Sequence, residues 1–266
     1  MEQVIQLAKF FILSFSASTA GAICGIGGGI IMKPVLDAAG MLPVSSISFL
    51  AGCTVLSMAV ITVCKKVKQG NQVIDTRRST PLAIGAALGG VLGKELFQYV
   101  YVVWPDENKV GAIQAGILIF LTIGTLFYTL KMDKVKTCQI SNRGICCLSG
   151  LFLGILSSFL GIGGGPINLV VLSFFFSMDA KTSAANSIYV IVFSQLTGLI
   201  GTIVSGTVPE FSIAILLVMI GGGIIGGCIG GRIDRRISVK HVQKLFIGMM
   251  IVIIGINLYN LNKFLR

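Results

Sequence analysis

The chain alternates long apolar runs with short polar or basic breaks, and the runs fall into two sets of five. In the first half they cover roughly 4–24, 30–39, 43–64, 80–103 and 110–130, and in the second half roughly 144–160, 166–177, 182–205, 211–231 and 242–260. A membrane-spanning helix needs about 20 residues, which most runs provide. The second run of each half extends only about 15–18 Å as a helix and is too short to span. The pattern predicts an all-α integral membrane protein with about 8 to 10 full spans.

The same glycine motif precedes the short run in each half. Gly25-Ile26-Gly27-Gly28-Gly29 stands in the first half, and the same five residues recur at 161–165, 136 residues later. Because each glycine costs about 1 kcal/mol relative to alanine inside a helix, adjacent glycines predict a helix break. Each half is therefore expected to contain a broken or re-entrant helix pair plus three spanning helices.

Positive charge predicts how the two halves are oriented. Lys and Arg cluster at 65–78, 131–143 and 232–244, whereas the breaks at 104–107 and 206–210 contain neither. The positive-inside rule places the first three loops in the cytoplasm and the other two outside. The third run then crosses in opposite directions in the two halves, so the halves are predicted to be inverted-topology repeats.

The predicted organisation is a membrane repeat over 1–131, a cytoplasmic linker over 132–143 and a second membrane repeat over 144–266. A competing interpretation fuses the first two runs of each half into one span and gives two parallel four-helix repeats. That arrangement would place the basic residues of 232–240 outside. The positive-inside rule therefore favours inversion.

Composition supports a membrane protein and argues against other classes. Hydrophobic residues make up 54% of the chain, charged residues 12%, and the mean hydropathy is +0.92, whereas a soluble domain carries roughly 25% charged residues. The net charge of +11 comes mainly from loop clusters, so no nucleic-acid partner is expected. The 7 cysteines show no CxxC spacing and His241 is the single histidine, so neither a metal site nor a cofactor is expected.

The two helix breaks predict a site for a small anionic substrate. A short helix begins at each motif, so its unpaired N–H groups and the positive end of its dipole lie at the break. Glycine lets the backbone approach an anion closely. Secondary transporters commonly bind substrate where broken helices of inverted repeats meet. The predicted binding glycines are Gly27, Gly28, Gly29, Gly163, Gly164 and Gly165.

A few polar side chains near these breaks are candidates to complete the site. Asn168 follows the second motif, while Asn186 and Gln195 lie inside a later apolar run, where such amides are uncommon. Ser57 is a weaker candidate because serine can bond to carbonyls of its own helix.

Two charged positions inside the apolar runs allow more specific expectations. Lys33 follows the first motif and either points its ammonium toward the anion or extends to the outer headgroups beside Asp37. Both alternatives stay open. Glu95 is expected to be neutralised by the adjacent Lys94, which disfavours a carboxylate proton relay.

Glycines at four-residue spacing predict close helix packing, as small residues do in lipid. They form two corresponding sets, Gly85, Gly89 and Gly93 in the first half and Gly223, Gly227 and Gly231 in the second.

A hydrophobic chain of this length with two Gly-x-Gly-Gly-Gly motifs, the first followed by Pro34, resembles the TauE/SafE sulfite exporter family. The resemblance covers nearly the whole chain. It implies a multi-pass permease of the cytoplasmic membrane that exports sulfite or a small organosulfonate. The motif glycines, including Gly25 and Gly161, carry over directly. The second copy differs, with Val170 where Pro34 predicts proline and Pro166 at a first-turn position that helices tolerate.

Three other functions compete with this interpretation. A membrane-embedded enzyme is disfavoured because HExxH, GxSxG and the Gly-Lys-[Ser/Thr] ending of a P-loop are missing. A structural or assembly subunit would use the glycines for packing alone. A transporter of a different small anion would share the architecture. The lipid bilayer is an expected partner, and homo-oligomerisation is left open.

Overall fold

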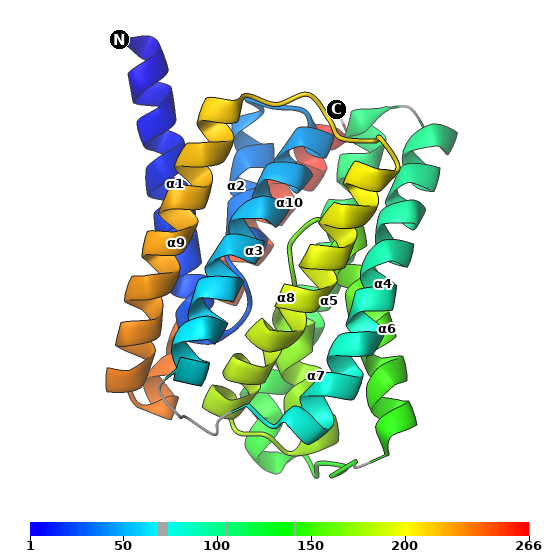
Figure 1. The fold of residues 1–266 in the computed structure, drawn as a ribbon, viewed down its shortest axis with the longest axis vertical. Coiled ribbons are helices and arrows are strands. Elements are labelled where there is room, and N and C mark those ends of the chain that lie inside the picture. Colours follow the sequence, from blue (N-terminus) through cyan, green and yellow to red (C-terminus); the bar gives the residue numbers. More distant parts are fainter. Residues whose placement is uncertain (69–73, 105, 141, 266) are drawn as a thin grey trace.

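The computed structural model describes residues 1–68, 74–104, 106–140 and 142–265, and within them the chain is helical throughout (Figure 1). The elements are α1 (Glu2–Cys24), α2 (Gly29–Ala39), α3 (Val44–Lys68), α4 (Thr76–Val103), α5 (Glu107–Lys131), η1 (Met132–Lys134), α6 (Arg143–Leu160), α7 (Pro166–Phe176), α8 (Ala180–Val204), α9 (Ile213–Arg236) and α10 (Val239–Phe264). The ten α-helices match the ten predicted runs. The prediction of an all-α membrane protein is confirmed.

Seven of the described helices are long and apolar enough to cross a membrane, namely α1, α3, α5, α6, α8, α9 and α10. The two short helices, α2 and α7, each contain 11 residues, as expected for segments that do not span. The remaining helix, α4, has 28 residues but carries charged residues at Arg77, Arg78, Lys94 and Glu95. These charges, together with its glycines, lower the apolar character that a span requires.

The two halves of the chain interleave instead of forming separate bodies. The most extensive helix contacts join α4 to α6 and α1 to α9, so the first helix of each half packs along the fourth helix of the other half. The third helices, α3 and α8, contact each other in the middle, and the fifth helices, α5 and α10, also pair. Figure 1 shows α9 beside α1 at one side of the bundle and α4 with α6 at the other.

The glycines at four-residue spacing lie at the contacts between these helix pairs. A Cβ added to Gly85, Gly89 or Gly93 of α4 would collide with carbonyl oxygens of α6. The glycines of α9 that lie against α1 in the same way are Gly222, Gly226 and Gly230. The predicted close packing holds for Gly223 and Gly227, which lie against α3, and is wrong for Gly231, which faces open space. One residue rotates a helix position by about 100°, which is enough to change its neighbour.

These contacts repeat with a nearly constant offset. Gly85 lies against the carbonyl of Cys147, and Gly222 lies against the carbonyl of Phe11, which is 136 residues before Cys147. Gly90 approaches the carbonyl of Ser194, and Gly227 approaches the carbonyl of Met58 with the same separation. The relation between the halves thus extends from the sequence motif to the backbone contacts.

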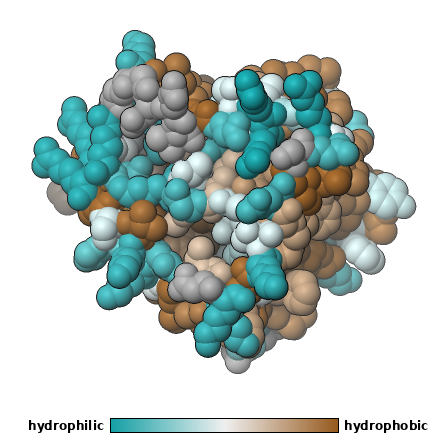
Figure 2. Space-filling view, turned by 90° about the horizontal axis from the view of Figure 1, so that it is seen from below, coloured by the Kyte–Doolittle hydropathy of each residue, from teal (hydrophilic) through white to brown (hydrophobic). Residues whose placement is uncertain are grey.

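The basic loops gather at one end of the molecule. The Nζ of Lys66 lies 3.1 Å from the Oδ2 of Asp234, which joins the ends of α3 and α9. The Nε2 of Gln243 contacts the carbonyl oxygen of Thr129 at 3.5 Å, which brings the 131–143 segment to the same end. Residues 69–73 of the first basic loop, and residues 105 and 141, lie outside the described part of the chain. Figure 2 shows hydrophilic side chains around this end.

The opposite end holds the loops that contain neither Lys nor Arg. There, the Oγ of Ser46 at the start of α3 donates to the carbonyl oxygen of Glu210 at 2.7 Å. The contacts at both ends make α3 and α8 antiparallel. Two parallel four-helix repeats would instead place the 232–240 loop at the end of the molecule opposite the other basic loops. Inversion of the halves across a bilayer stays a prediction.

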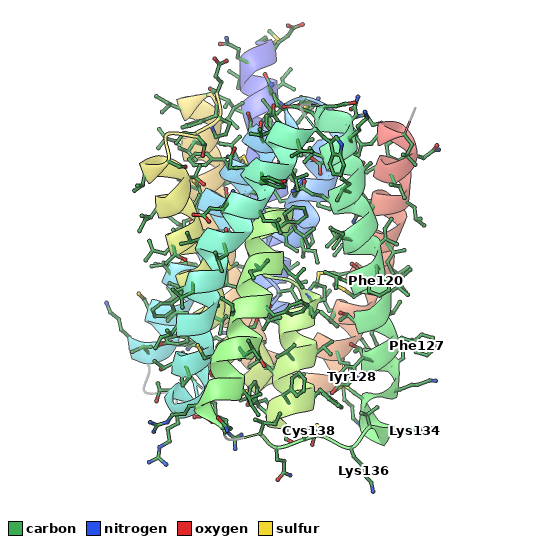
Figure 3. All side chains as sticks on the ribbon, turned by 90° about the vertical axis from the view of Figure 1, so that its right-hand side faces the viewer. Phe120, Phe127, Tyr128, Lys134, Lys136 and Cys138 are labelled. Carbon is green, nitrogen blue, oxygen red and sulfur yellow. The ribbon has the colours of Figure 1, made fainter. Side chains whose placement is uncertain are left out.

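The side of α5 illustrates the apolar belt that surrounds the helices. Phe120 is 76% exposed and Phe127 is 61% exposed, and both point away from the bundle in Figure 3. Lys134, Lys136 and Cys138 follow at the basic end (Figure 3). Exposed aromatic side chains above a basic rim suit a bilayer surface with the basic end at the headgroups.

We expect the basic end to be cytoplasmic. In a variant without the native cysteines, Ser238→Cys should resist an impermeant maleimide added to intact cells, whereas Thr207→Cys should react. Both positions are exposed, so access depends on the side of the membrane. Permeabilised cells provide the control, in which both must react. Labelling of Ser238→Cys in intact cells would contradict the predicted topology.

We expect Gly89→Ala to weaken the α4–α6 contact. The new methyl group would collide with the carbonyl of Leu151, and overpacking of this kind costs about 1–3 kcal/mol. The matched control is Gly221→Ala in α9, where a Cβ meets nothing within 4 Å and alanine favours the helix by about 1 kcal/mol. Thermal unfolding in detergent measures both. Equal stability of the two variants would contradict the packing role.

Candidate functional site

The first glycine segment reverses the chain between α1 and α2. Gly25 ends α1 in the left-handed conformation with φ of 74°, and its N–H donates to the carbonyl oxygen of Gly21 at 2.8 Å. Gly27 also has a positive φ of 73°. L-residues with side chains rarely adopt this region, so glycine is required at both positions.

The second segment repeats this geometry between α6 and α7. Gly161 ends α6 with φ of 64°, and Gly163 and Gly164 have φ of 69° and 109°. Pro166 is the first residue of α7, where its fixed φ suits a helix start. The second motif copy differs from the first by Pro166 after the glycines and Val170 in place of proline, and this difference leaves the short helix α7 intact.

The two glycine segments lie directly against each other. A Cβ added to Gly27 would lie 3.0 Å from the carbonyl oxygen of Gly163, and one on Gly29 would collide with Ile162. Val55 of α3 and Ile191 of α8 pack around this junction from the two sides. The sequence predicted that the breaks would meet, and the structure places them in backbone contact.

The junction concentrates backbone donors that have no acceptor among the described residues. Among the hydrogen bonds of the described residues, none uses the N–H groups of Gly27, Gly28, Gly29, Gly163, Gly164 or Gly165. Unpaired amides in an apolar setting cost several kcal/mol each unless a ligand, water or a rearrangement satisfies them. The two segments are in backbone contact, and the cavity that adjoins the second segment lies beside the junction.

A small cavity adjoins the second segment. Its empty volume is about 260 Å³, and it is lined by Gly164, Gly165 and Asn168 together with apolar residues of α5 and α6. Asn168 is 2% exposed, and its Oδ1 has no hydrogen-bond partner among the described residues. A Cβ on Gly164 would lie 3.4 Å from the Nδ2 of Asn168, so the side-chain amide lies at the glycines.

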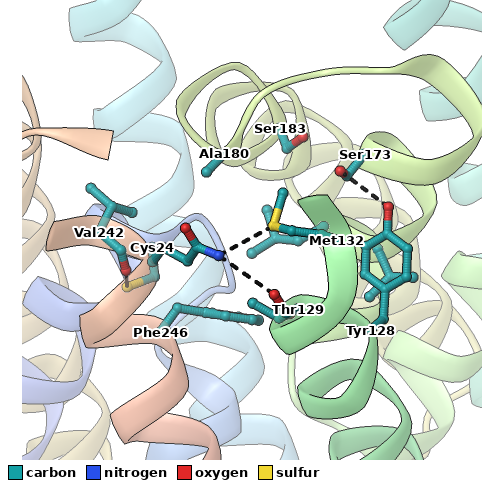
Figure 4. A pocket seen from close by; sticks show the side chains of 12 residues that line it. Cys24, Tyr128, Thr129, Met132, Ser173, Ala180, Ser183, Val242 and Phe246 are labelled. Carbon is teal, nitrogen blue, oxygen red and sulfur yellow. Dashed lines mark hydrogen bonds between the residues drawn. The ribbon is translucent and has the colours of Figure 1, made fainter. Parts of the chain in front are cut away.

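A larger pocket leads from the basic end toward the first segment (Figure 4). It has an empty volume of about 430 Å³ and extends from Met132 and Gln243 to Cys24, the last residue of α1. Its polar lining includes Thr129, Ser173 and Gln243, with hydrogen bonds from Gln243 to Thr129 and from Tyr128 to Ser173. We call this hollow the vestibule. It ends at Cys24, one residue before the first glycine segment.

The equivalent place at the other end is closed. Residues 136 positions before Leu169 and Ser173 of the vestibule are Lys33 and Asp37. The Nζ of Lys33 lies 2.8 Å from the Oδ2 of Asp37, and the two side chains are 3% and 8% exposed. The ammonium of Lys33 is thus held by Asp37 instead of pointing at the glycines. One of the two alternatives for Lys33 was extension to the outer headgroups beside Asp37. The structure shows the pairing with Asp37, but both side chains are buried.

The C-terminal helix reinforces this closed end. The Nδ2 of Asn260 donates to the carbonyl oxygen of Pro34 at 2.8 Å. The Nζ of Lys263 donates to the carbonyl oxygens of Asp37 and Ala38, both at 3.1 Å. Polar groups at the end of α2 are therefore bonded to α10, and the two ends of the molecule differ.

The other predicted side chains divide between two places. Gln195 lies one turn after Ile191, and its Nε2 contacts the Oγ of Ser157 at 3.5 Å near the second segment. Asn186 lies away from the junction, because its Oδ1 accepts from the N–H of Asp75 at 3.0 Å, at the start of α4.

Ser57 also lies away from the junction. Its Oγ donates to the carbonyl oxygen of Thr54 at 2.7 Å, and it faces Gly223 of α9. Asn186 and Ser57 are therefore placed in helix packing, whereas the six glycines, Asn168 and Gln195 are brought together.

Lys94 is a candidate that the sequence interpretation missed. Its Nζ lies 5.8 Å from the ring centre of Phe97, and no ion pair of the described residues includes it. A Cβ on Gly198 would lie 3.1 Å from the Oγ of Ser158 and 3.6 Å from the Cγ of Lys94. Since Ser158 precedes Gly161 by three residues, the stem of Lys94 lies near the helix turn that leads into the second segment.

The expected neutralisation of Glu95 by Lys94 does not occur. Glu95 is exposed while Lys94 is partly buried against α6 and α8. Adjacent residues on a helix do not face each other, because ion pairs form at spacings of three or four. A lysine inside an apolar run without an acidic residue at those spacings was the signal that could have identified it.

Comparison with known proteins follows the same outline. A family model described as Sulfite exporter TauE/SafE matches residues 10–258. The chain belongs to the TauE/SafE family. Members are membrane transporters, so this chain is a multi-pass transporter that works in a lipid bilayer on a small-molecule substrate.

Two curated relatives agree with this TauE/SafE assignment. The probable membrane transporter protein YunE of Bacillus subtilis is 22% identical, with 93% of this chain and 95% of the relative covered. A second probable membrane transporter protein, from Methanocaldococcus jannaschii, is 26% identical, with 91% of each chain covered. No solved structure matches the chain. Within the described residues, no group of three or more His, Cys, Asp or Glu side chains could hold a metal ion.

We expect the Lys33–Asp37 pair to be an energetic unit. Asp37→Asn leaves the buried ammonium of Lys33 unpaired and should lower the free energy of unfolding by about 3–5 kcal/mol. The double variant Lys33→Met, Asp37→Leu removes both charges and should recover most of this loss. Thermal unfolding in detergent compares the two. If Asp37→Asn alone left stability unchanged, the ammonium would have to reach water or another acceptor.

Proposed function

We propose that this TauE/SafE transporter carries a small sulfur oxyanion, sulfite or an organosulfonate, across the cytoplasmic membrane. The observation that carries the proposal is the junction of the two glycine segments, where six backbone N–H groups have no acceptor among the described residues. Two short helices begin there, and helix N-termini favour anions through their free amides and dipoles. The name of the matching family model supports sulfite as the substrate class.

Side chains around the junction supply the remaining contacts of the proposed site. The Oδ1 of Asn168 is buried without a partner among the described residues, and its Nδ2 lies beside Gly164, where its N–H groups would donate to an oxyanion. Lys94 adds the positive charge in place of Lys33, whose ammonium is engaged by Asp37. Gln195 contacts Ser157, and Ser158 lies beside Gly198, so both are near the last turn of α6. Charge-assisted hydrogen bonds of this kind are roughly twice as strong as neutral ones.

The anion site forms only when the glycine segments separate. In the state described here the segments touch, the vestibule extends from the basic end to Cys24, and Lys33, Asp37 and α10 occupy the equivalent place at the other end. Rocking of one repeat, 1–131, against the other, 144–266, would part the segments and exchange the open end. The contact between the two segments and the difference between the two ends support this description, and transporters built from inverted repeats move in this way.

The membrane potential supports export. In a cell that is negative inside, moving one negative charge outward is favoured by about 2.3 kcal/mol per 100 mV. Export of sulfite therefore requires no coupling ion. Asp37 is buried inside an apolar run, and Lys33 holds it in an ion pair.

One observation favours a second candidate function. The closely packed glycines of α1, α4, α6 and α9 would also suit a structural or assembly subunit, and Gly27 itself touches the opposite segment. Replacing Gly27 by a larger residue would disturb packing under either function. The two functions are therefore separated better at Asn168 and Lys94, which are not in the backbone contact.

We expect proteoliposomes containing the protein to release sulfite, with thiosulfate, sulfoacetate and sulfate as comparison anions. Asn168→Leu and Lys94→Met should each lower the flux about 10- to 100-fold, the effect of losing one hydrogen bond to a charged group. Both should leave thermal unfolding close to that of the unmodified protein. Lys134→Met at the exposed basic end is the matched control and should leave the flux unchanged.

The results separate the alternatives. If another anion were transported and sulfite were not, the proposed substrate would be wrong and the proposed site would stand. Absence of flux for every anion, with correctly inserted protein, would favour the structural subunit. Full activity of both variants would contradict the proposed site even if sulfite were transported.

A further inference from the structure

A hollow lined by cationic side chains lies between the last turns of α3 and α9, separate from the vestibule. Its empty volume is about 510 Å³, and its lining includes Lys65, Lys66, Arg232 and Arg235. The hollow opens at the basic end of the molecule, the face seen in Figure 2. We call it the α3–α9 pocket.

The charge of this pocket is only partly balanced. The Oδ2 of Asp234 accepts from Lys66 at 3.1 Å, and the main-chain oxygen of Asp234 accepts from Lys181 at 2.8 Å. No ion pair of the described residues uses Lys65 or Arg232. The lining contains no carboxylate, so the pocket has an excess of positive charge. Its natural occupant is an anion.

A glycine keeps the pocket open. A Cβ added to Gly231 would meet nothing within 4 Å. Positions in α9 correspond to positions 137 residues earlier in α4, so Gly231 corresponds to Lys94. Positions in α8 correspond to positions 136 residues earlier in α3, so Gly198 corresponds to Thr62 of the pocket lining. In that other half the side chain of Lys94 fills the equivalent place against Gly198. The hollow is thus specific to one half and does not follow from the repeat.

The pocket continues into a surface suited to lipid tails. Ile224, one turn from Cys228 of the lining, is 38% exposed, and the neighbouring Ile225 is 45% exposed. An amphipathic ligand could therefore place its charged group among the cations and its chains along α9.

We propose that the α3–α9 pocket binds the phosphate of an anionic phospholipid headgroup at the basic end of the protein. Lys65 and Arg232 contact the phosphate, while Asp234 orients Lys66 at the rim. Guanidinium groups bind phosphate in two-pronged geometry, and each interfacial cation strengthens binding to anionic lipid. The positive-inside rule explains why cations lie at this end, but it does not explain why they surround a hollow that a glycine keeps open.

The test uses the full-length protein in detergent, titrated with phosphatidylglycerol or phosphatidylcholine and followed by native mass spectrometry. Phosphatidylglycerol should be retained preferentially, and Lys65→Ala with Arg232→Ala should weaken its binding about 30-fold, the effect of two interfacial cations. Gly231→Leu should weaken it at least about tenfold without any change in net charge, because the new side chain occupies the hollow.

Matched controls distinguish a built pocket from diffuse charge. Lys134→Ala with Lys136→Ala removes two cations from the same end, and Gly248→Leu adds a side chain where a Cβ also meets nothing within 4 Å. Both should bind phosphatidylglycerol within about twofold of the unmodified protein. Equal loss in the Lys134 and Lys136 variant, or unchanged binding in Gly231→Leu, would overturn the proposal.

A parallel titration with inorganic phosphate identifies the source of the phosphate group. Millimolar phosphate should fail to displace bound phosphatidylglycerol, since it cannot use the apolar flank of the pocket. Retention of inorganic phosphate without any preference for phosphatidylglycerol over phosphatidylcholine would overturn the lipid assignment. Normal thermal unfolding of the variants shows that each result reports binding and not misfolding.

Discussion

The structure depends on one backbone contact in the middle of an apolar bundle. Two chain reversals meet there, and only glycine permits both the positive φ angles and the distance at which the segments touch. A broken helix in hydrocarbon leaves amides that must be satisfied or sheltered. The long helices α3 and α8 shelter the reversals by packing Val55 and Ile191 around them. The same arrangement that makes the breaks tolerable also collects their free amides at one point.

The exchange of helices between the halves follows from this contact. Because α1 packs along α9 and α6 packs along α4, each half holds the reversing segment of its partner in place. Glycines on α4 and α9 allow these helix pairs to approach until backbone meets backbone, where packing replaces the hydrophobic drive that is absent in lipid. A movement of one half against the other must therefore act on the glycine junction directly.

Chemical differences between equivalent positions make the two ends unequal. Lys33 and Asp37 close one end at positions that correspond to Leu169 and Ser173, which line the vestibule at the other end. Lys94 fills a place that Gly231 leaves open in the other half. Contacts recur between the halves at a nearly constant offset, and differences at a few equivalent positions distinguish the vestibule, the Lys33–Asp37 pair and the basic pocket.

The sequence by itself determined the local structure. The apolar run at 144–160 became α6 over Arg143–Leu160, and the run at 166–177 became α7 over Pro166–Phe176. Helix formation follows from periodic apolar residues, and the breaks follow from adjacent glycines, so both can be read from neighbouring positions. Charge also predicted that the three basic loops share one end.

Only the tertiary structure decided which side chains meet. Asn186 and Ser57 belong to helix packing, Asn168 lies at the glycines, and Lys94 faces the last turn of α6 instead of Glu95. A polar residue inside an apolar helix looks the same in sequence whether it faces a substrate site or a neighbouring helix. Its partner depends on the rotation of each helix and on contacts between residues more than 100 positions apart, which no local pattern contains.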